Sequence, residues 1–298
     1  MSKRIEFVEY GGPEVLRRVD GPVVEPGPGQ VRIRTELIGV NPIDWKMTAG
    51  HFGDALRRPA VPGWASTGIV DAVGPRVRAF AVGDPVIAGP RGGSYREHLV
   101  VDARLVVPRP STVSPEQAAG LPSSGVAGYS LIHHLGVTAE DTVLIHGAAG
   151  SVGAAAVQIA VACGARVIRT ASPANHAYLR SIGAEPVAYG PDLIDAVQGL
   201  GDVTAVADAV GGPDPVAATT HLLPTMRRAV TVWGDRYSTA AGIPWVDHPA
   251  DELERTVELA AAGRLTVRIA EILPLDDAAI AFSHSRSGHS PGKILLRP

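Results

Sequence analysis

The pattern of hydrophobic and polar positions changes near residue 141 of the chain. Before it, short alternating or β-branched runs such as VRIRTELIGV and STGIVDAVG are separated by Gly and Pro clusters, which is typical of antiparallel β structure. After it, apolar runs of strand length such as TVLIHG and ARVIRTAS alternate with helical patterns such as SVGAAAVQIAVACG. This alternation predicts an α/β fold with a doubly wound parallel sheet.

The last part of the chain returns to strand and helix pieces and ends in the apolar run KILL. We expect this tail to pair with the amino-terminal β structure. The predicted domains are residues 1–122 with 265–298, and residues 123–264, closely apposed across a cleft. Gly164 and Gly183 each follow a helical run and are predicted to end it in the left-handed conformation.

Charge and cysteine content narrow the setting. The 298 residues carry 27 Lys and Arg against 30 Asp and Glu, a formal net charge of −3, so we expect no nucleic-acid partner and no anionic membrane surface. No apolar segment follows the charged amino terminus, so no signal peptide is predicted.

The single cysteine, Cys163, cannot form an internal disulfide, which favours a cytoplasmic protein. We expect Cys163 to be a small buried residue within a helix. The apolar run 147–165 nearly reaches the length of a membrane span, but it opens with a turn after a strand pattern, which favours a buried turn and helix.

The strongest chemical signal is the junction between a buried strand and a helix, which reads Gly147-Ala148-Ala149-Gly150-Ser151-Val152-Gly153. Small residues let backbone N–H groups approach a pyrophosphate, and the helix amino terminus adds free donors and a partial positive charge. Close packing alone also selects small residues. The position at the start of a βαβ series favours dinucleotide binding.

The end of the next strand bears on the choice of dinucleotide. An NAD-selective site usually has Asp or Glu about 20 residues beyond the turn. Here the chain reads Arg169-Thr170-Ala171-Ser172, so no acid would repel a 2′-phosphate, and Ser172, His176 and Arg169 could donate hydrogen bonds to one. This favours NADPH. Turn and helix-capping roles for Thr170 and Ser172, and a surface strand position for Arg169, remain open.

Several motifs occur in a fixed order along the chain: GVNPIDWKMTAG, PAVPGWASTGIVDAVG, GGSYREHLVV, HGAAGSVGAAAVQIA and PGKILL. With these motifs the chain resembles the zinc-independent quinone oxidoreductase branch of the medium-chain dehydrogenase/reductases. The resemblance implies a GroES-like β domain completed by the carboxyl-terminal tail, a Rossmann domain, NADPH as cofactor, and a homodimer. It implies hydride transfer to a quinone or an α,β-unsaturated carbonyl without a metal. The stretch after Pro62 lacks the His-Glu pair of the zinc enzymes, and one cysteine cannot build either of their zinc sites.

The resemblance also implies roles for single residues. Asn41 is expected to line the nicotinamide and substrate end of the site, and Asp44 to have a structural role, as a turn residue or a hydrogen-bond partner. His51 is a candidate proton donor, because Gly-His-Phe stands where related enoyl reductases have Gly-x-Tyr. A turn role for Asn41 and a solvated loop position for His51 are the local alternatives. Further cofactor contacts are expected at Tyr189, Val210 and Trp233, and walls of a flat substrate pocket at Trp45, Phe52, Trp64 and Tyr129. Ordinary packing of the aromatic side chains, and a core or edge position for Tyr189, are the alternatives.

Two departures from relatives leave other functions open. Ala65 stands where relatives have Asp, and Ala127-Gly128 where they often have Thr-Ala, so less polarity is expected in the site. One alternative is a biosynthetic enzyme on the same scaffold that reduces a polyketide-type enone or performs a non-redox rearrangement. Another is a nucleotide-binding protein that is not an enzyme.

Overall fold

The computed structural model describes residues 1–51, 53, 57–223, 225, 228–288 and 290–298. These residues form two compact units. The first comprises Met1–Ser123 with Val267–Pro298, and the second comprises Ser124–Thr266.

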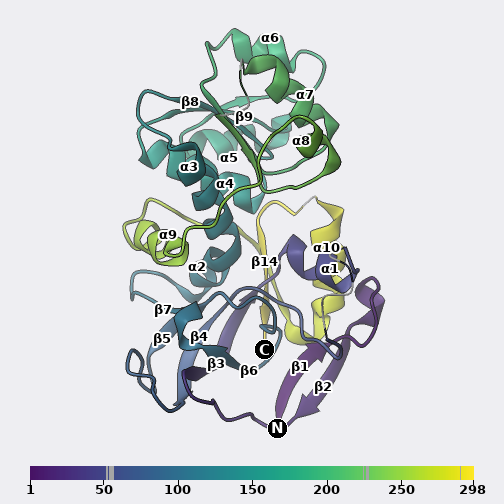
Figure 1. The fold of residues 1–298 in the computed structure, drawn as a ribbon, viewed down its shortest axis with the longest axis vertical. Coiled ribbons are helices and arrows are strands. Elements are labelled where there is room, and N and C mark those ends of the chain that lie inside the picture. The colour runs from purple at the N-terminus through teal and green to yellow at the C-terminus, as the bar shows by residue number, and fades with distance from the viewer. Residues whose placement is uncertain (52, 54–56, 224, 226–227, 289) are drawn as a thin grey trace. The chain divides into compact units, whose positions relative to one another are not determined.

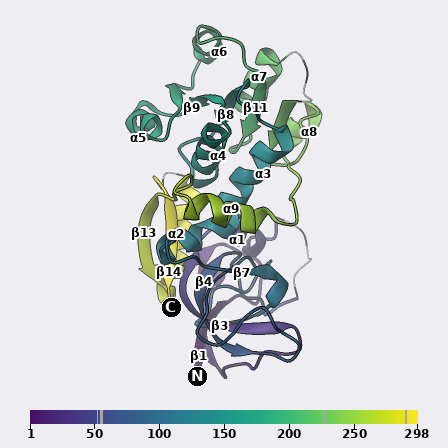
Figure 2. The same cartoon turned by 90° about the vertical axis from the view of Figure 1, so that its left-hand side faces the viewer.

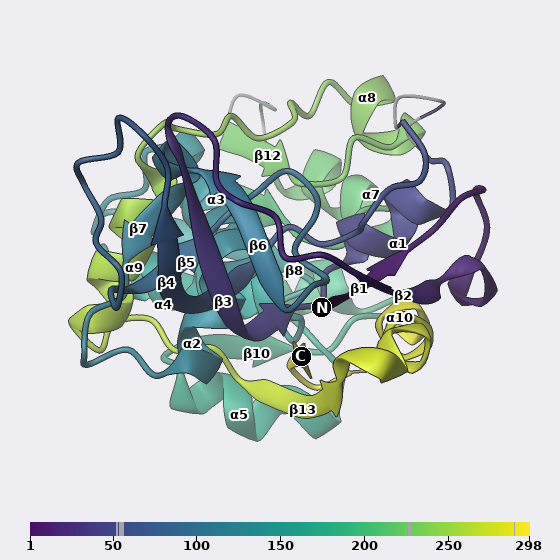
Figure 3. The same cartoon turned by 90° about the horizontal axis from the view of Figure 1, so that it is seen from below.

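The first unit is built on one mixed sheet with the strand order β13-β14-β3-β4-β5-β7, in which β6 also pairs with β3 (Figures 1 and 3). The strands are β3 (Gln30–Gly39), β4 (Ser66–Val73), β5 (Pro85–Ala88), β6 (His98–Asp102), β7 (Val106–Pro108), β13 (Ile269–Pro274) and β14 (Lys293–Arg297). A separate antiparallel ribbon joins β1 (Ser2–Glu6) to β2 (Arg17–Gly21). The helices of this unit are α1 (Pro42–Thr48), α2 (Pro115–Gly120) and α10 (Ala278–Ser287), with 3₁₀ turns at Pro13–Val15, Ala103–Leu105 and Leu275–Asp277 and a π turn that begins at Leu121.

The carboxyl-terminal tail completes this sheet, as the sequence predicted. Strand β14 runs antiparallel to β3, with Leu295 opposite Gly39 and Leu296 opposite Ile38, and parallel to β13. In Figure 1 this yellow segment lies beside the purple and blue strands of the chain's beginning. Residues distant in the sequence therefore meet at the centre of one sheet.

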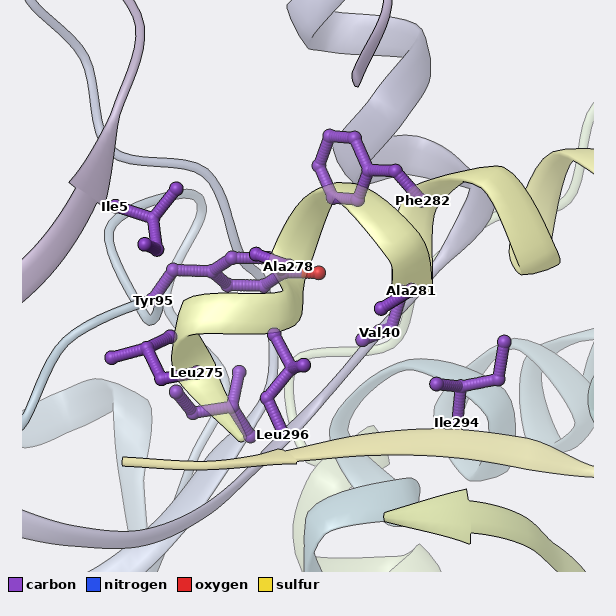
Figure 4. Packing of buried hydrophobic residues seen from close by; sticks show 10 residues of the cluster. Ile5, Val40, Tyr95, Leu275, Ala278, Ala281, Phe282, Ile294 and Leu296 are labelled. Carbon is purple, nitrogen blue, oxygen red and sulfur yellow. The ribbon is translucent and has the colours of Figure 1, made fainter. Parts of the chain in front are cut away.

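Apolar side chains from both ends of the chain form the core between this sheet and α10 (Figure 4). Tyr95 lies edge-on to Phe282, with ring centroids 5.8 Å apart, a favourable geometry for two aromatic rings. The other members of the cluster are Ile5, Ile38, Val40, Leu275, Ala278, Ala281, Ile294 and Leu296. This core fixes the position of α10 against β14.

The second unit holds a parallel sheet with the order β10-β9-β8-β11-β12. Its strands are β8 (Thr142–His146), β9 (Arg166–Thr170), β10 (Glu185–Val187), β11 (Ala205–Asp208) and β12 (Ala229–Thr231). Its helices are α3 (Val126–Leu135), α4 (Ser151–Ala162), α5 (His176–Ser181), α6 (Leu193–Gln198), α7 (Pro213–Leu222), α8 (Arg236–Ala240) and α9 (Glu252–Ala261), with a 3₁₀ turn at Pro173–Asn175. Figure 2 shows α4 alongside β8 and β9, which it contacts. The predicted doubly wound sheet is confirmed, and its strand order reverses between β8 and β11, where such folds bind ligands.

Two local expectations have opposite outcomes. Gly164 and Gly183 adopt φ of +86° and +90° as predicted, because each follows a helix where the chain must reverse. The expectation of a buried, mid-helix Cys163 is wrong: the residue is the exposed C-cap of α4. The buried stripe of α4 ends at Ala160, so the following turn faces solvent.

The short helices α1 and α2 were not predicted. The sequence pattern gave no helical period for α1 and α2, because seven and six residues are too few to show one. Within the described residues, no helix combines the length and the apolar character that a bilayer crossing requires.

Candidate functional site

The turn between β8 and α4 depends on two glycines. Gly147 has φ of +70°, and a Cβ atom there would lie 2.8 Å from Cβ of Val210. A Cβ atom on Gly153 would lie 2.4 Å from the carbonyl oxygen of Gly147. Gly150 is extended, and α4 starts at the next residue, Ser151. The glycines thus leave room for a ligand to approach the backbone closely at the amino terminus of a 12-residue helix. Such a place suits a pyrophosphate.

The carboxyl ends of β8, β11 and β12 bring further predicted residues to this turn. One oxygen of Asp208 accepts the backbone N–H groups of Val210 and Gly211 at 3.0 and 2.9 Å, and the other accepts the Thr231 hydroxyl at 2.8 Å. The indole N–H of Trp233 donates to the carbonyl of Ala209 at 3.1 Å. Val210 and Trp233 therefore lie at the same edge of the sheet as Gly147.

A buried histidine lies directly behind the turn and was missed by the sequence analysis. Nδ1 of His146 lies 3.3 Å from Oγ1 of Thr170, and its Nε2 lies 3.5 Å from Oγ1 of Thr219. Burial lowers the pKa of His146 to about 4, although the charge of Asp208 acts in the opposite direction. The imidazole is neutral at pH 7. Its place immediately before Gly147, at the end of a strand, is the signal that could have revealed it.

The residues after β9 have local roles. The hydroxyl of Ser172 accepts a hydrogen bond from Asn175 at 3.2 Å, and Nε2 of His176 lies 3.2 Å from the carbonyl oxygen of Ala171. Ser172 and His176 are both half-buried, whereas Tyr189 is 65% exposed. No acidic side chain occurs in the stretch 169–176.

The side chain of Arg169 is enclosed. The possibility of a surface strand position is wrong, because the residue is 0% exposed. Among the described residues none makes a hydrogen bond to its three guanidinium nitrogens. Burial and the nearby charge of Arg180 lower the pKa of Arg169 to about 10, so the side chain is still a cation at pH 7. The guanidinium is therefore a buried charge at the end of β9.

In the first unit, Asn41 is the N-cap of α1, and Pro42 follows at the first helical position, where a missing N–H costs nothing. Asn41 is 1% exposed. Its backbone N–H donates to Oδ2 of Asp44 at 2.9 Å, and its side-chain Nδ2 donates to the carbonyl of Gly39 at 2.9 Å. Its Oδ1 accepts a hydrogen bond from the ammonium of Lys293. Both ends of the Asn41 carboxamide are thus held by the protein.

Asp44 is a buried hydrogen-bond partner, as expected. Burial raises the pKa of Asp44 to about 7, while the charge of Lys293 and hydrogen bonds from Asn41 and Tyr95 partly oppose the shift. Burial lowers the pKa of Lys293 to about 8, against the attraction of Asp44. The sequence analysis quoted Lys293 within PGKILL without giving it a role.

The predicted pocket walls belong to both units of the chain. Trp45 lies edge-on to the exposed His51, with ring centroids 5.9 Å apart. Trp64 lines a small pocket with mostly apolar residues and with Asp44, Thr48 and Arg91. Tyr129 belongs to α3 of the second unit and stacks on His133. Phe52 lies outside the described residues.

The side chains present do not suit a catalytic or structural zinc. No three His, Cys, Asp or Glu side chains gather as ligands anywhere in the described parts of the chain. The whole sequence contains one cysteine, which is exposed at the end of α4. A structural zinc site needs four ligands and a catalytic site three.

A parallel doubly wound sheet with a glycine turn at its switch point, joined to a separate β domain, defines the class of dinucleotide-binding oxidoreductases. Residues 27–111 match the alcohol dehydrogenase GroES-like domain family, and residues 182–296 match the zinc-binding dehydrogenase family. The chain belongs to the quinone oxidoreductases of the medium-chain dehydrogenase/reductase superfamily, whose members bind a nicotinamide coenzyme.

Three similar proteins illustrate this membership. A quinone oxidoreductase of Pseudomonas aeruginosa is 40% identical over 199 residues, which cover 65% of this chain and 61% of the relative. The structure of a quinone oxidoreductase from Pseudomonas syringae is 31% identical and has a TM-score of 0.85, with 100% of both chains covered. The structure of a mycobacterial protein complexed with NADPH is 30% identical and has a TM-score of 0.86, again with 100% of both chains covered.

Proposed function

We propose that the chain is an NADPH-dependent, zinc-independent reductase of quinones or α,β-unsaturated carbonyls. The observation that carries the proposal is the turn at Gly147 and Gly153, followed by a strand, β9, whose end has no acid. The mycobacterial relative complexed with NADPH supports the choice of coenzyme. The absence of a cysteine-rich or histidine-rich ligand set in the described residues supports a reaction without zinc.

In this proposal the second unit binds the coenzyme. Backbone N–H groups of the turn, Gly147 to Gly153, hold the pyrophosphate, and Val210 and Trp233 contact the coenzyme beside it. The hydroxyls of Thr170 and Ser172, with His176 and Tyr189, surround the adenosine 2′-phosphate.

The first unit receives the acceptor. The bound coenzyme supplies a hydride to the acceptor carbon or oxygen. Asn41 lines the nicotinamide end, where a preorganised donor to a developing oxyanion contributes about 3 to 4 kcal/mol. His51, which is exposed, supplies the proton that completes the reduction. Trp45 and Trp64 of this unit contact the flat acceptor. We further propose a cytoplasmic homodimer.

The test is the loss of absorbance at 340 nm when NADPH is mixed with the protein and a panel of quinones and enones. Turnover that persists after exhaustive chelation supports the whole proposal. Coenzyme binding by calorimetry without turnover on any acceptor would identify a nucleotide-binding protein instead. Failure to bind either NADPH or NADH would refute the assignment of the turn.

A further inference from the structure

The side chain of Lys293 is buried at the start of β14. It is 2% exposed, and its stem passes over Gly39, where a Cβ atom would lie 3.2 Å from Cε of the lysine. Moving an ammonium group out of water costs several kcal/mol even after relaxation. An apolar residue would fill this place in the core more cheaply, so the amino group itself needs an explanation.

The ammonium donates a hydrogen bond to Oδ1 of Asn41. Lysine has three donors and no acceptor, whereas a carboxamide presents an acceptor at one end and two donors at the other. An ammonium can therefore bind only the oxygen of the Asn41 amide. It dictates that the NH₂ group points away from Lys293.

The other end of the same carboxamide meets weaker constraints. Nδ2 of Asn41 donates to the Gly39 carbonyl at 2.9 Å and lies 3.5 Å from Oδ2 of Asp44. The second distance is at the limit of a hydrogen bond, so one N–H of the amide is only loosely engaged. Without the ammonium, no positive charge at position 293 would favour the oxygen of the Asn41 amide over its NH₂ group.

We infer that Lys293 is a positioning residue, whose ammonium fixes the orientation of the Asn41 carboxamide that the proposed reduction uses. The inference rests on the proposed function, which places Asn41 at the nicotinamide end. A negative partner is present in the same core, because Asp44 from α1 lies close enough for its charge to act on Lys293. Tyr95 in turn donates to Asp44, so the ammonium of Lys293, the carboxyl group of Asp44 and the hydroxyl of Tyr95 belong to one buried polar network.

The arrangement has a pH signature. The pKa of Lys293 is lowered to about 8, so the amino group becomes neutral as the pH rises above that value. A neutral amine can accept as well as donate, and it no longer dictates the amide orientation. Activity that depends on Asn41 should decline in the same range.

The test is a double-mutant cycle on kcat/KM for quinone reduction, with Lys293→Met, Asn41→Ala and the double variant. We expect Lys293→Met to lower kcat/KM on the order of 100-fold, the size of a 1 Å misplacement. In the Asn41→Ala background the same substitution should change kcat/KM less than about threefold, because the group it positions is gone. Lys3→Met is the matched control: this lysine pairs with Glu97 at the surface, and its loss should leave kcat/KM unchanged.

Two further readouts complement the cycle. Fluorescence titration gives the NADPH dissociation constant, which should rise several-fold in Lys293→Met and show the same coupling to Asn41. If Lys293→Met does not fold, the pH profiles of the parent and Asn41→Ala decide instead: kcat/KM of the parent should fall above about pH 8, and that of Asn41→Ala should not.

Additive effects in the cycle, or identical pH profiles for the parent and Asn41→Ala, would overturn the inference while leaving the proposed function intact. A parent protein that oxidises NADPH with no quinone or enone would remove the proposed function, and the inference with it. The two failures are thus distinguished by the activity of the parent alone.

Discussion

The hydroxyl of Tyr95 donates a hydrogen bond of 3.1 Å to Oδ2 of Asp44, and both side chains are buried. The bond connects the segment before β6 to α1 and completes the polar network beneath Asn41. Burial raises the pKa of the Tyr95 hydroxyl well above its usual range, so Tyr95 is a hydrogen-bond donor at neutral pH.

Removal of this donor should destabilise the fold. Tyr95→Phe leaves a buried carboxylate oxygen with one donor fewer, which costs roughly 1 to 3 kcal/mol. The free energy of unfolding from urea titration at pH 8 measures the loss. Tyr10→Phe is the control, because the Tyr10 hydroxyl bonds to Gly53 at an exposed position. Equal losses in the two variants would contradict the prediction.

Stability should depend on acid through His146. The pKa of His146 is lowered from 6.5 to about 4, so between these values the unfolded chain binds a proton that the folded protein does not. The free energy of unfolding should therefore fall as the pH falls from 6.5 to 4, by up to about 1.4 kcal/mol per pH unit. His146→Gln should flatten this slope, and the exposed His221→Gln should not. An unchanged slope in His146→Gln would assign the acid sensitivity to other groups.

A single methyl group in the turn should block coenzyme binding. The Cβ atom of Gly153→Ala would meet the Gly147 carbonyl at 2.4 Å, so the turn must open. Overpacking of this kind costs about 1 to 3 kcal/mol, which corresponds to roughly a tenfold to hundredfold weaker affinity for NADPH. Gly199→Ala in the same unit is the control, because its Cβ would lie 3.3 Å from the nearest atom. Calorimetric titration with NADPH checks the difference, and circular dichroism confirms that both variants fold.

A single substitution should weaken the preference for NADPH over NADH. Ser172→Asp places a carboxylate after β9, where it would repel a 2′-phosphate. We expect the affinity for NADPH to fall about tenfold, near 1.4 kcal/mol, while the affinity for NADH does not fall. Ser181→Asp, an exposed position in α5, controls for the added charge. Equal losses for both coenzymes would refute a 2′-phosphate contact at Ser172.

The buried side chain of Arg169 should lower the free energy of unfolding. Its guanidinium nitrogens have no hydrogen-bond partner among the described residues. Replacing even a buried ion pair by apolar side chains is often neutral or stabilising by about 1 to 4 kcal/mol, and an unpaired buried charge costs more. We expect Arg169→Met to raise the free energy of unfolding. Arg166 begins the same strand and forms an exposed ion pair with Glu185 of β10. Arg166→Met should therefore change the free energy of unfolding by less than about 1 kcal/mol. A large loss in Arg169→Met would mean that the charge is compensated in the folded protein.

The residues that the sequence predicted well are those whose roles depend on near neighbours. Gly164 and Gly183 adopt positive φ because each ends a helix that is followed closely by a strand, and this requirement is visible in the local pattern. The bond between Lys293 and Asn41 joins positions 252 apart, and no periodicity reports such a pairing. The burial of Arg169 was also missed, because a charged residue at the end of a strand pattern looks the same whether or not a helix covers it.

The pairing of β14 with β3 has a consequence for biosynthesis. Strand β14 is synthesised after β3 and after the whole second unit, so β3 emerges from the ribosome before β14 is available to pair with it. The intervening residues of the second unit can fold in the meantime. A nascent chain that stalled before Lys293 would expose an unpaired β edge together with an apolar core, which is the kind of surface that chaperones hold.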